Sequence, residues 1–200
     1  MSISDIDTSL VTVGQPVDGG CCYTSFAEEP KLPANASADM ASAEGWESLG
    51  ELSQNGYTEG MQINSQNFRG WHGSVVLSVV NEETHTYRLE FIEVSRAAVT
   101  KVRYGIANVS VDGQGNVTEI RGKSGQLKPI PLVIDELESN GWKRRTVVEK
   151  AQITSIDDTP HQKGDLMVYG LTFTAIEVNG NPFKIYRAMP AGSGGAGNNG

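Results

Sequence analysis

Residues 71–94 read WHGSVVLSVVNEETHTYRLEFIEV, and the pattern of this stretch decides the fold. Its two halves alternate with the period of two that β-strands show, and their side chains are mostly β-branched or aromatic. The polar residues 81–84 separate the two halves, so the pattern predicts one long β-hairpin with its turn at 81–84. One face of the hairpin would carry Val75, Leu77 and Val79 on the first arm and Tyr87, Leu89 and Phe91 on the second.

The opposite face of this hairpin is also partly apolar, because it would carry Val76, Val80 and Ile92 among its polar residues. A sheet with a single buried face alternates cleanly between apolar and polar side chains. We therefore expect something else to cover the second face, such as another copy of the chain. Val76, Val80 and Ile92 are the candidate residues for contacts between subunits.

The rest of the chain predicts further short strands. Asn-Gly pairs at 55–56, 140–141 and 179–180 and an Asp-Gly pair at 112–113 indicate turns between strands in 46–64, 106–120, 127–156 and 166–186. Residues 64–70 read as a polar loop. Ser95 is typical of a helix N-cap, which predicts a helix over 96–104 that Gly105 ends. These elements predict an all-β fold with one short helix, arranged as an antiparallel sandwich or barrel.

Three segments of different character follow from the composition. Residues 1–45 lack sustained periodicity and form an extended N-terminal arm, 46–187 form the β-rich domain, and 188–200 form a flexible glycine-rich tail. The adjacent Cys21 and Cys22 lie in the arm, where we expect two reduced thiols, since neighbouring cysteines rarely bridge. A bridge between two chains is the alternative.

The charge and hydropathy exclude some classes of protein. A formal net charge of −8 argues against a protein that grips nucleic-acid phosphates, which needs a basic surface. No apolar run is long enough to cross a membrane, so we expect no membrane binding. The first residues, MSISDIDTSL, lack the basic and apolar regions of a secretory signal, which predicts assembly in a cytoplasm.

No pattern in the chain predicts an active site, a metal site or a cofactor. His72, His85 and His161 do not stand at metal-ligand spacing, and Asp157-Asp158 reads as a solvated turn before a proline. The G-x-G-x-x-G at 192–197 has neither the strand nor the helix of a dinucleotide site. The three tryptophans each follow a glycine and could cap the core or stack on sugars. A β-sandwich carbohydrate-binding module therefore stays open as an alternative function.

The ordered segments taken together resemble a known family. GWESLGELSQNGYTEG, the hairpin 71–94, SRAAVTKVRYG, VIDELESNGWKRRTVVEKAQITSIDD and GLTFTAIEVNGNPFKIY resemble the major tail tube proteins of phages with long non-contractile tails, the siphovirus type. The likeness points to members from phages of actinobacteria. It covers roughly residues 40–187 and leaves out the N-terminal arm and the glycine-rich end.

This resemblance implies a structural role rather than an enzymatic one. Members of the family form hexameric rings that stack into the tail tube, and strands from all subunits close one inner β-barrel through which viral DNA leaves the capsid. The implied partners are further copies of the chain and the tail terminator, tape measure and tail tip proteins, and the implied location is the virion tail. Another ring-forming tail or connector protein, such as a tail terminator, is the alternative within phage tails.

If the chain forms such a tube, its net charge of −8 predicts roles for particular residues. A lumen that lets DNA slide without sticking should be net negative. The lumen-facing candidates are Glu59, Glu82, Glu83, Glu90 and Glu93. The N-terminal arm and residues 53–70 are expected to make the contacts from ring to ring.

Overall fold

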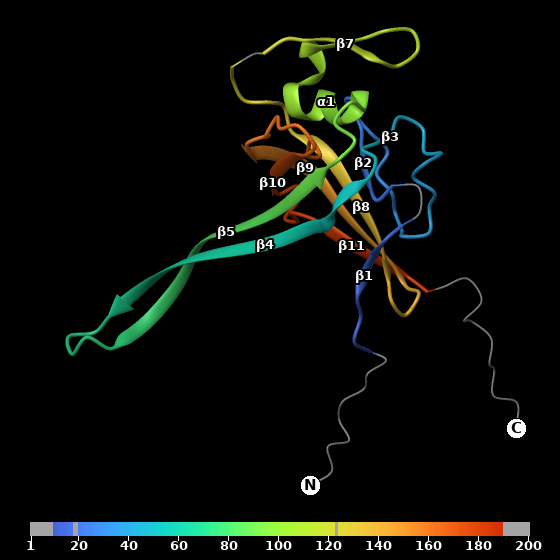
Figure 1. Cartoon of the computed structure of the whole chain (residues 1–200). Coiled ribbons are helices and arrows are strands. Elements are labelled where there is room, and N and C mark those ends of the chain that lie inside the picture. Colours follow the sequence, from blue (N-terminus) through green and yellow to red (C-terminus); the bar gives the residue numbers. More distant parts are fainter. Residues whose placement is uncertain (1–9, 18–19, 123, 190–200) are drawn as a thin grey trace, which may run out of the picture.

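Nine strands form one antiparallel sheet in the computed structural model, which describes residues 10–17, 20–122 and 124–189. The strands are β1 (Gly14–Pro16), β2 (Cys22–Thr24), β3 (Glu47–Ser48), β4 (Leu52–Arg69), β5 (Val75–Phe91), β8 (Ile130–Glu138), β9 (Lys143–Ile156), β10 (Tyr169–Ala175) and β11 (Lys184–Ala188). Their order is β3-β2-β8-β9-β10-β5-β4, with β1 beside β8 and β11 beside β9 (Figure 1). The all-β prediction is confirmed.

A small upper layer joins β5 to β8. It contains the helix α1 (Ala97–Tyr104), the short 3-10 helix η2 (Ile106–Asn108) and the separate hairpin β6 (Val109–Val111) and β7 (Val117–Ile120). The predicted stop at Gly105 is confirmed, because Gly105 has φ of 89° and its N–H donates to the Lys101 carbonyl. The predicted Ser95 cap is wrong, since the helix begins one residue later and Arg96 occupies the cap without a side-chain hydrogen bond.

The predicted hairpin within residues 71–94 is wrong, because this stretch forms a single strand whose hairpin partner lies before it in the chain. β5 runs without interruption through residues 81–84, and its partner is β4, which precedes it in the chain. The turn lies at residues 70–74, where the Gly70 N–H donates to the Ser74 carbonyl (2.9 Å). β4 also contains the predicted turn at 55–56, which is an irregularity between Leu52 and Tyr57, and most of the predicted loop 64–70. Polar residues are tolerated in these strands because water reaches both of their faces.

The core lies between the body of the sheet and α1. The apolar faces of β5, β8, β9 and β10 meet there, and α1 covers them with Ala98, Val99 and Val102. A second, smaller cluster lies on the other face of β8 and β9, where Val133 and Val147 pack against Tyr23 and Met40. Both faces of the central strands are therefore buried, which explains their continuous apolar sequence.

Part of the expected N-terminal arm belongs to this body. β2 pairs with β3 on one side and β8 on the other, and Cys22 is fully buried in the core. Both cysteines are free, as expected, but neither is exposed. Residues 35–38 are also fixed to the sheet, because the buried Arg145 pairs with Asp135 (2.6 Å) and donates to backbone carbonyls in this loop.

No helix within the described ranges has the length and apolar character that a membrane span requires. The glycine-rich end beyond residue 189 lies outside the described residues.

Candidate assembly surface

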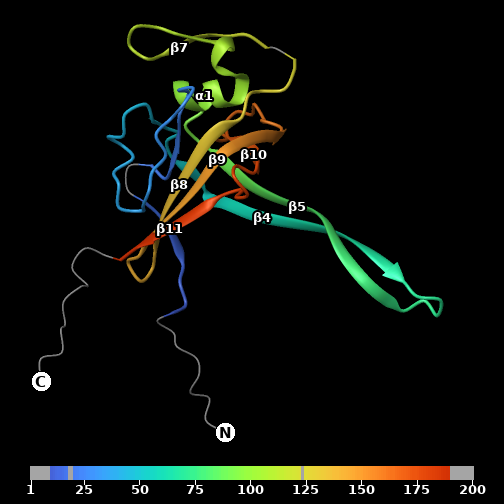
Figure 2. The ribbon, with the colours of Figure 1, turned by 180° about the vertical axis from the view of Figure 1, so that it is seen from behind.

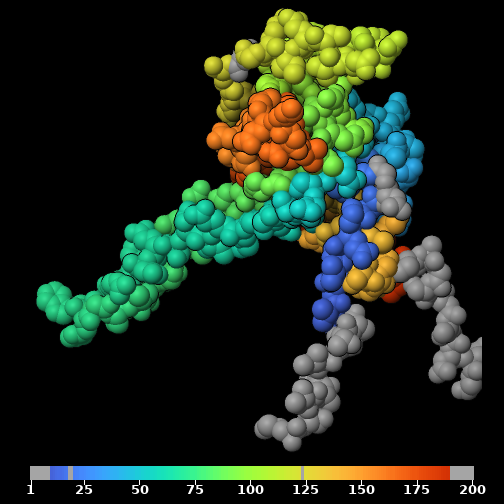
Figure 3. Space-filling view, in the orientation of Figure 1, coloured from blue at the N-terminus to red at the C-terminus, as the bar shows by residue number. Residues whose placement is uncertain are grey.

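The hairpin of β4 and β5 leaves the body as a two-stranded arm. β10 pairs with β5 only from Thr86 to Phe91, so residues 61–69 and 75–85 pair only with each other. Figure 3 shows this part as a rod that stands away from the rest of the molecule. At about 3.3 Å per residue, the 18 residues of β4 span about 60 Å. A lone two-stranded ribbon is marginally stable in water, so this arm needs a partner.

The arm also exposes many large apolar side chains. Every residue in 61–69 and in 71–83 is exposed. The exposed apolar residues are Met61, Ile63, Phe68, Trp71, Val75, Val76, Leu77, Val79 and Val80. Soluble monomers rarely present so much contiguous apolar surface unless it is a site of interaction.

The edges of the arm carry unpaired backbone groups. Among the described strands β4 has a neighbour on one side only, and β5 has none beyond β4 over residues 75–85. Such long edges are templates for pairing with another chain, and natural proteins normally protect them. Apolar side chains and free edges thus mark the same segment as an assembly surface.

Two bulges decide which face each residue of β5 takes. Asn64 pairs with Glu82, whereas the next residue, Ser65, pairs with Val80, so Asn81 is an extra residue on β5. Paired residues share a face, and consecutive strand residues alternate. Val80 therefore lies on the same side of the hairpin as Leu89, and not on the opposite one as the simple alternation predicts.

Exposure rather than face distinguishes the predicted contact residues from the core. Val80 is 58% exposed on the arm, whereas Leu89, on the same side, is fully buried in the body. Val76 is the extra residue of the second bulge and is exposed as well. Ile92 follows the end of β5 and is half-buried at the body, so it does not belong to the arm. The role of all three in subunit contacts stays a prediction.

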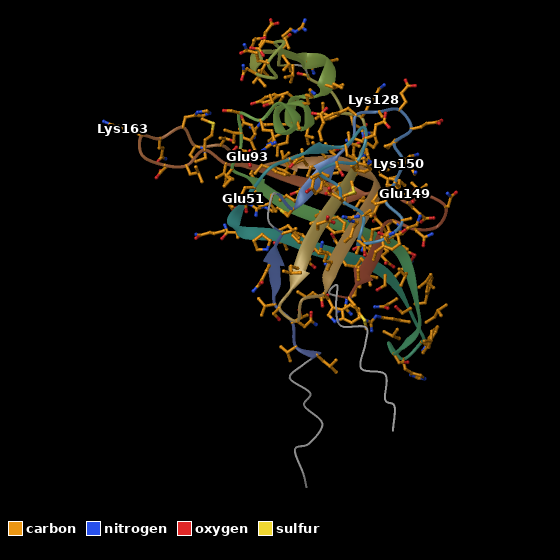
Figure 4. All side chains as sticks on the ribbon, turned by 90° about the vertical axis from the view of Figure 1, so that its right-hand side faces the viewer. Glu51, Glu93, Lys128, Glu149, Lys150 and Lys163 are labelled. Carbon is orange, nitrogen blue, oxygen red and sulfur yellow. The ribbon has the colours of Figure 1, made fainter. Side chains whose placement is uncertain are left out.

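The five candidate lumen glutamates do not share one face. The register places Glu59 and Glu83 on the side of the core, and Glu82 and Glu90 on the other side. Glu93 follows β5 at the body, and Figure 4 labels it beside Glu51, whose N–H it accepts (2.8 Å). Most are paired with basic groups: Glu59 with Arg144, Glu83 with His85, Glu90 with Arg88 and Glu93 with Arg96. A wall formed by one face can therefore hold only part of this set.

A polar network holds the base of the arm to the body. Arg144 on β9 donates to Glu136 (2.6 Å), to the Tyr57 hydroxyl (2.8 Å) and to Glu59 (3.2 Å). The Tyr57 hydroxyl donates to Glu136, and the Tyr87 hydroxyl donates to Glu59. Burial and the neighbouring carboxylates raise the pKa of both hydroxyls, so both stay protonated donors at neutral pH. The network is absent from any sequence motif, because its members lie up to 87 residues apart.

Removing Arg144 should loosen the arm at its base. Arg144→Met leaves Glu136 and Glu59 without their cation, and we expect the free energy of unfolding to fall by about 2–3 kcal/mol, below the loss for a fully buried pair. The control is Lys184→Met, which removes an exposed pair with Glu149 and should cost less than about 1 kcal/mol. Urea unfolding of the unassembled subunit measures both. Equal losses in the two variants would show that the network does not stabilise the subunit.

The described residues do not support a metal site or a sugar-binding site. No group of three His, Cys, Asp or Glu side chains in the described ranges could hold a metal ion. Two tryptophans are packed: the Trp46 indole donates to the Lys31 carbonyl, and Trp142 lies under the Arg187 guanidinium. Trp71 alone is fully exposed, far from both at the tip of the arm. The three do not form a shared platform for a sugar.

Comparison with known proteins points to one family. A protein-family model described as phage tail tube protein matches residues 23–187. Among solved structures the chain is similar to the anti-feeding prophage cap, the tube terminating cap. That match has 12% sequence identity and a TM-score of 0.41, and it covers 94% of this chain and 100% of the cap. No curated protein matches by sequence.

Proposed function

The chain belongs to the phage tail tube protein family, and on this premise we propose that it forms hexameric rings that stack into a hollow tail tube. Its place in a family of tail structural proteins makes it a component of the virion and indicates a non-enzymatic role. In the proposed tube, viral DNA passes through the lumen on its way into the host cell.

The arm of β4 and β5 is the observation that carries this proposal. A subunit that worked alone would have no use for a projecting ribbon with free edges and exposed apolar side chains. Pairing these edges with neighbouring copies would close the strands of the arms into one barrel around the ring and would remove the exposed edges of β4 and β5. Burial of Val80, Met61 and Ile63 against a neighbour would supply the driving free energy.

The outer face of β4 and β5, away from the core, suits a lumen wall. Over residues 58–66 and 82–88 the register places mostly uncharged polar residues there, among them Thr58, Gln62, Asn64, Gln66, Thr84 and Thr86. Toward the tip the same face continues with the apolar Phe68, Leu77 and Val79. Of the glutamates, Glu82 and Glu90 share this face and would repel phosphates, while Arg88 is engaged by Glu90 and Asp157. DNA would meet a surface without free cations to hold it, so it would slide.

The finer parts of the proposal rest on the sequence resemblance. They are the siphovirus type, an actinobacterial host, assembly in the host cytoplasm without membrane binding, and contact with tail terminator, tape measure and tail tip proteins. The N-terminal arm and residues 53–70 stay the proposed contacts between rings.

Negative-stain electron microscopy of the purified protein tests the function. Long tubes with a sixfold projection support the proposal. Single rings that do not stack would support the tail terminator alternative, and dispersed monomers at high concentration would contradict both.

A further inference from the structure

Trp71 is the most exposed large apolar side chain of the described residues, at 99%. It lies at the tip of the arm in a turn that is closely held. The Gly70 N–H donates to Ser74, the Gly73 N–H donates to Gly70 (2.9 Å), and the Arg69 guanidinium donates to the Gly73 carbonyl (2.8 Å). Because the backbone of the turn is already ordered, binding of the indole has to order only the torsions of one side chain, and tryptophan is a common interface anchor.

An apolar cavity on the body could receive such a side chain. It has a volume of about 520 Å³, within the range of small-ligand pockets, and lies between α1, η2 and residues 124–130. Its apolar lining consists of Phe26, Val102, Ile106, Leu127, Ile130 and Ile153, and Lys101 and Lys128 also line it. Figures 1 and 2 both place α1 on the side of the body away from the arm tip, and Figure 4 labels Lys128 at that end.

We propose that Trp71 of one subunit inserts into this cavity of another copy of the chain. The proposal rests on the proposed tube and names the contact that joins its subunits. Donor and acceptor are different surfaces at different ends of the molecule, so each subunit can give one contact and receive one. Contacts of this kind repeat along an assembly instead of closing in a two-fold dimer.

Charge favours a second copy of this chain as the occupant. The projecting part of the arm carries Glu82 and Glu83 against a single cation, Arg69. Two lysines line the cavity, and because Lys101 is already paired with Glu47 (3.2 Å), Lys128 is the one that can attract an acidic partner. Glu82 and Glu83 lie about 23 Å along the arm from Val75 near its tip, so they act as a general attraction between an acidic arm and Lys128 and not as contacts in the cavity. At the cavity itself, Lys128 beside the indole adds a cation–π attraction.

Two variants test the contact from its two sides, with the critical concentration for tube formation as the readout. Trp71→Ala should raise this concentration roughly thirtyfold, as expected for loss of an interface anchor, whereas Trp71→Phe should raise it much less. Ala107→Trp fills the acceptor cavity with its own indole, so it should block tubes although Trp71 is intact. Leu166→Ala is the control, since Leu166 is also a large exposed apolar side chain (64%) but lies on neither surface.

Fluorescence adds a readout that loss of folding cannot mimic. Trp71 emission, taken as the difference between wild type and Trp71→Phe, should move to shorter wavelength and resist iodide quenching in tubes. Circular dichroism should show unchanged melting of all unassembled variants. If tubes form normally with Trp71→Ala or Ala107→Trp, or if Trp71 stays open to iodide in tubes, the contact is overturned while the tube function stands. Absence of tubes from the wild-type protein would instead overturn the tube function.

Discussion

Leu89→Asp is expected to unfold the subunit, with a loss of more than about 4 kcal/mol, which exceeds the loss from most single substitutions. Leu89 is fully buried on β5 and pairs with Tyr57 on one side and Leu171 on the other. An aspartate at this position would lie in the apolar core cluster and would have to be desolvated or protonated. Circular dichroism melting of the unassembled variant measures the effect.

Val80→Asp is the matched variant on the same strand and the same side of the hairpin. Val80 is exposed on the arm, so the substitution should leave the melting temperature of the subunit unchanged. In the assembly it would place a charge where a valine is buried, and the loss of that burial costs about 1.5–3 kcal/mol per subunit. Every subunit of a ring carries the same loss, so electron microscopy should show no tubes.

The two variants distinguish a role in assembly, expected for the arm, from a role in subunit stability, expected for the body. Ordinary tubes from Val80→Asp would show that the arm is not an assembly surface. Unfolding of the Val80→Asp monomer together with tubes from Leu89→Asp would reverse the two roles. Either result would count against the tube as proposed here, because the arm is the feature that supports it.

The sequence predicts which residues of β5 are strand residues better than it predicts their partner. Alternation over 75–80 and 87–92 correctly indicates extended chain up to Phe91, where β5 ends. The four polar residues between them look like a turn, and Asn55-Gly56 looks like another. Neither is one, because β10 pairs with β5 over residues 86–91 and β4 follows the whole length of β5. Strand pairing over many residues therefore outweighs the local preference of these residues for turns.

The bulges explain why the faces could not be read from alternation. The extra residue Asn81 shifts every side chain beyond it to the other face of the hairpin, and nothing in the sequence of residues 79–84 indicates a bulge. Alternation assigns Val76 and Val80 to subunit contacts, because both faces of the predicted hairpin are partly apolar and a lone subunit could bury only one of them well. The structure agrees that they are exposed, but the reason is their position on the arm beyond the body.

The polar network at the base of the arm could not be predicted from the sequence for a different reason. Tyr57, Glu136 and Arg144 meet only because the sheet brings β4 across β8 and β9. Each residue taken alone resembles an ordinary strand residue with a polar tip. Trp71 is the opposite case, since Gly70-Trp71-His72-Gly73 is visible in the sequence, but its exposure depends on the turn that the strand pairing creates.

The N-terminal arm gives the second large expected effect. Deletion of residues 1–30 removes β2, which fills the space between β3 and β8 and buries Cys22 and Tyr23. The loss would open the edge of β8 and expose Val133 and Ile134, so the remaining chain should fail to fold or should aggregate. Calorimetry and size-exclusion chromatography of the purified protein measure both outcomes.

Deletion of residues 1–11 is the control, because Leu10 and Val11 are exposed and the first strand begins only at Gly14. This shorter deletion should melt within a few degrees of the full chain. Any contact that the first residues make between rings would then appear as shorter tubes without loss of subunit stability. If the longer deletion also melts like the full chain, β2 is dispensable. Residues 1–30 would then act only on assembly, as their sequence alone predicts.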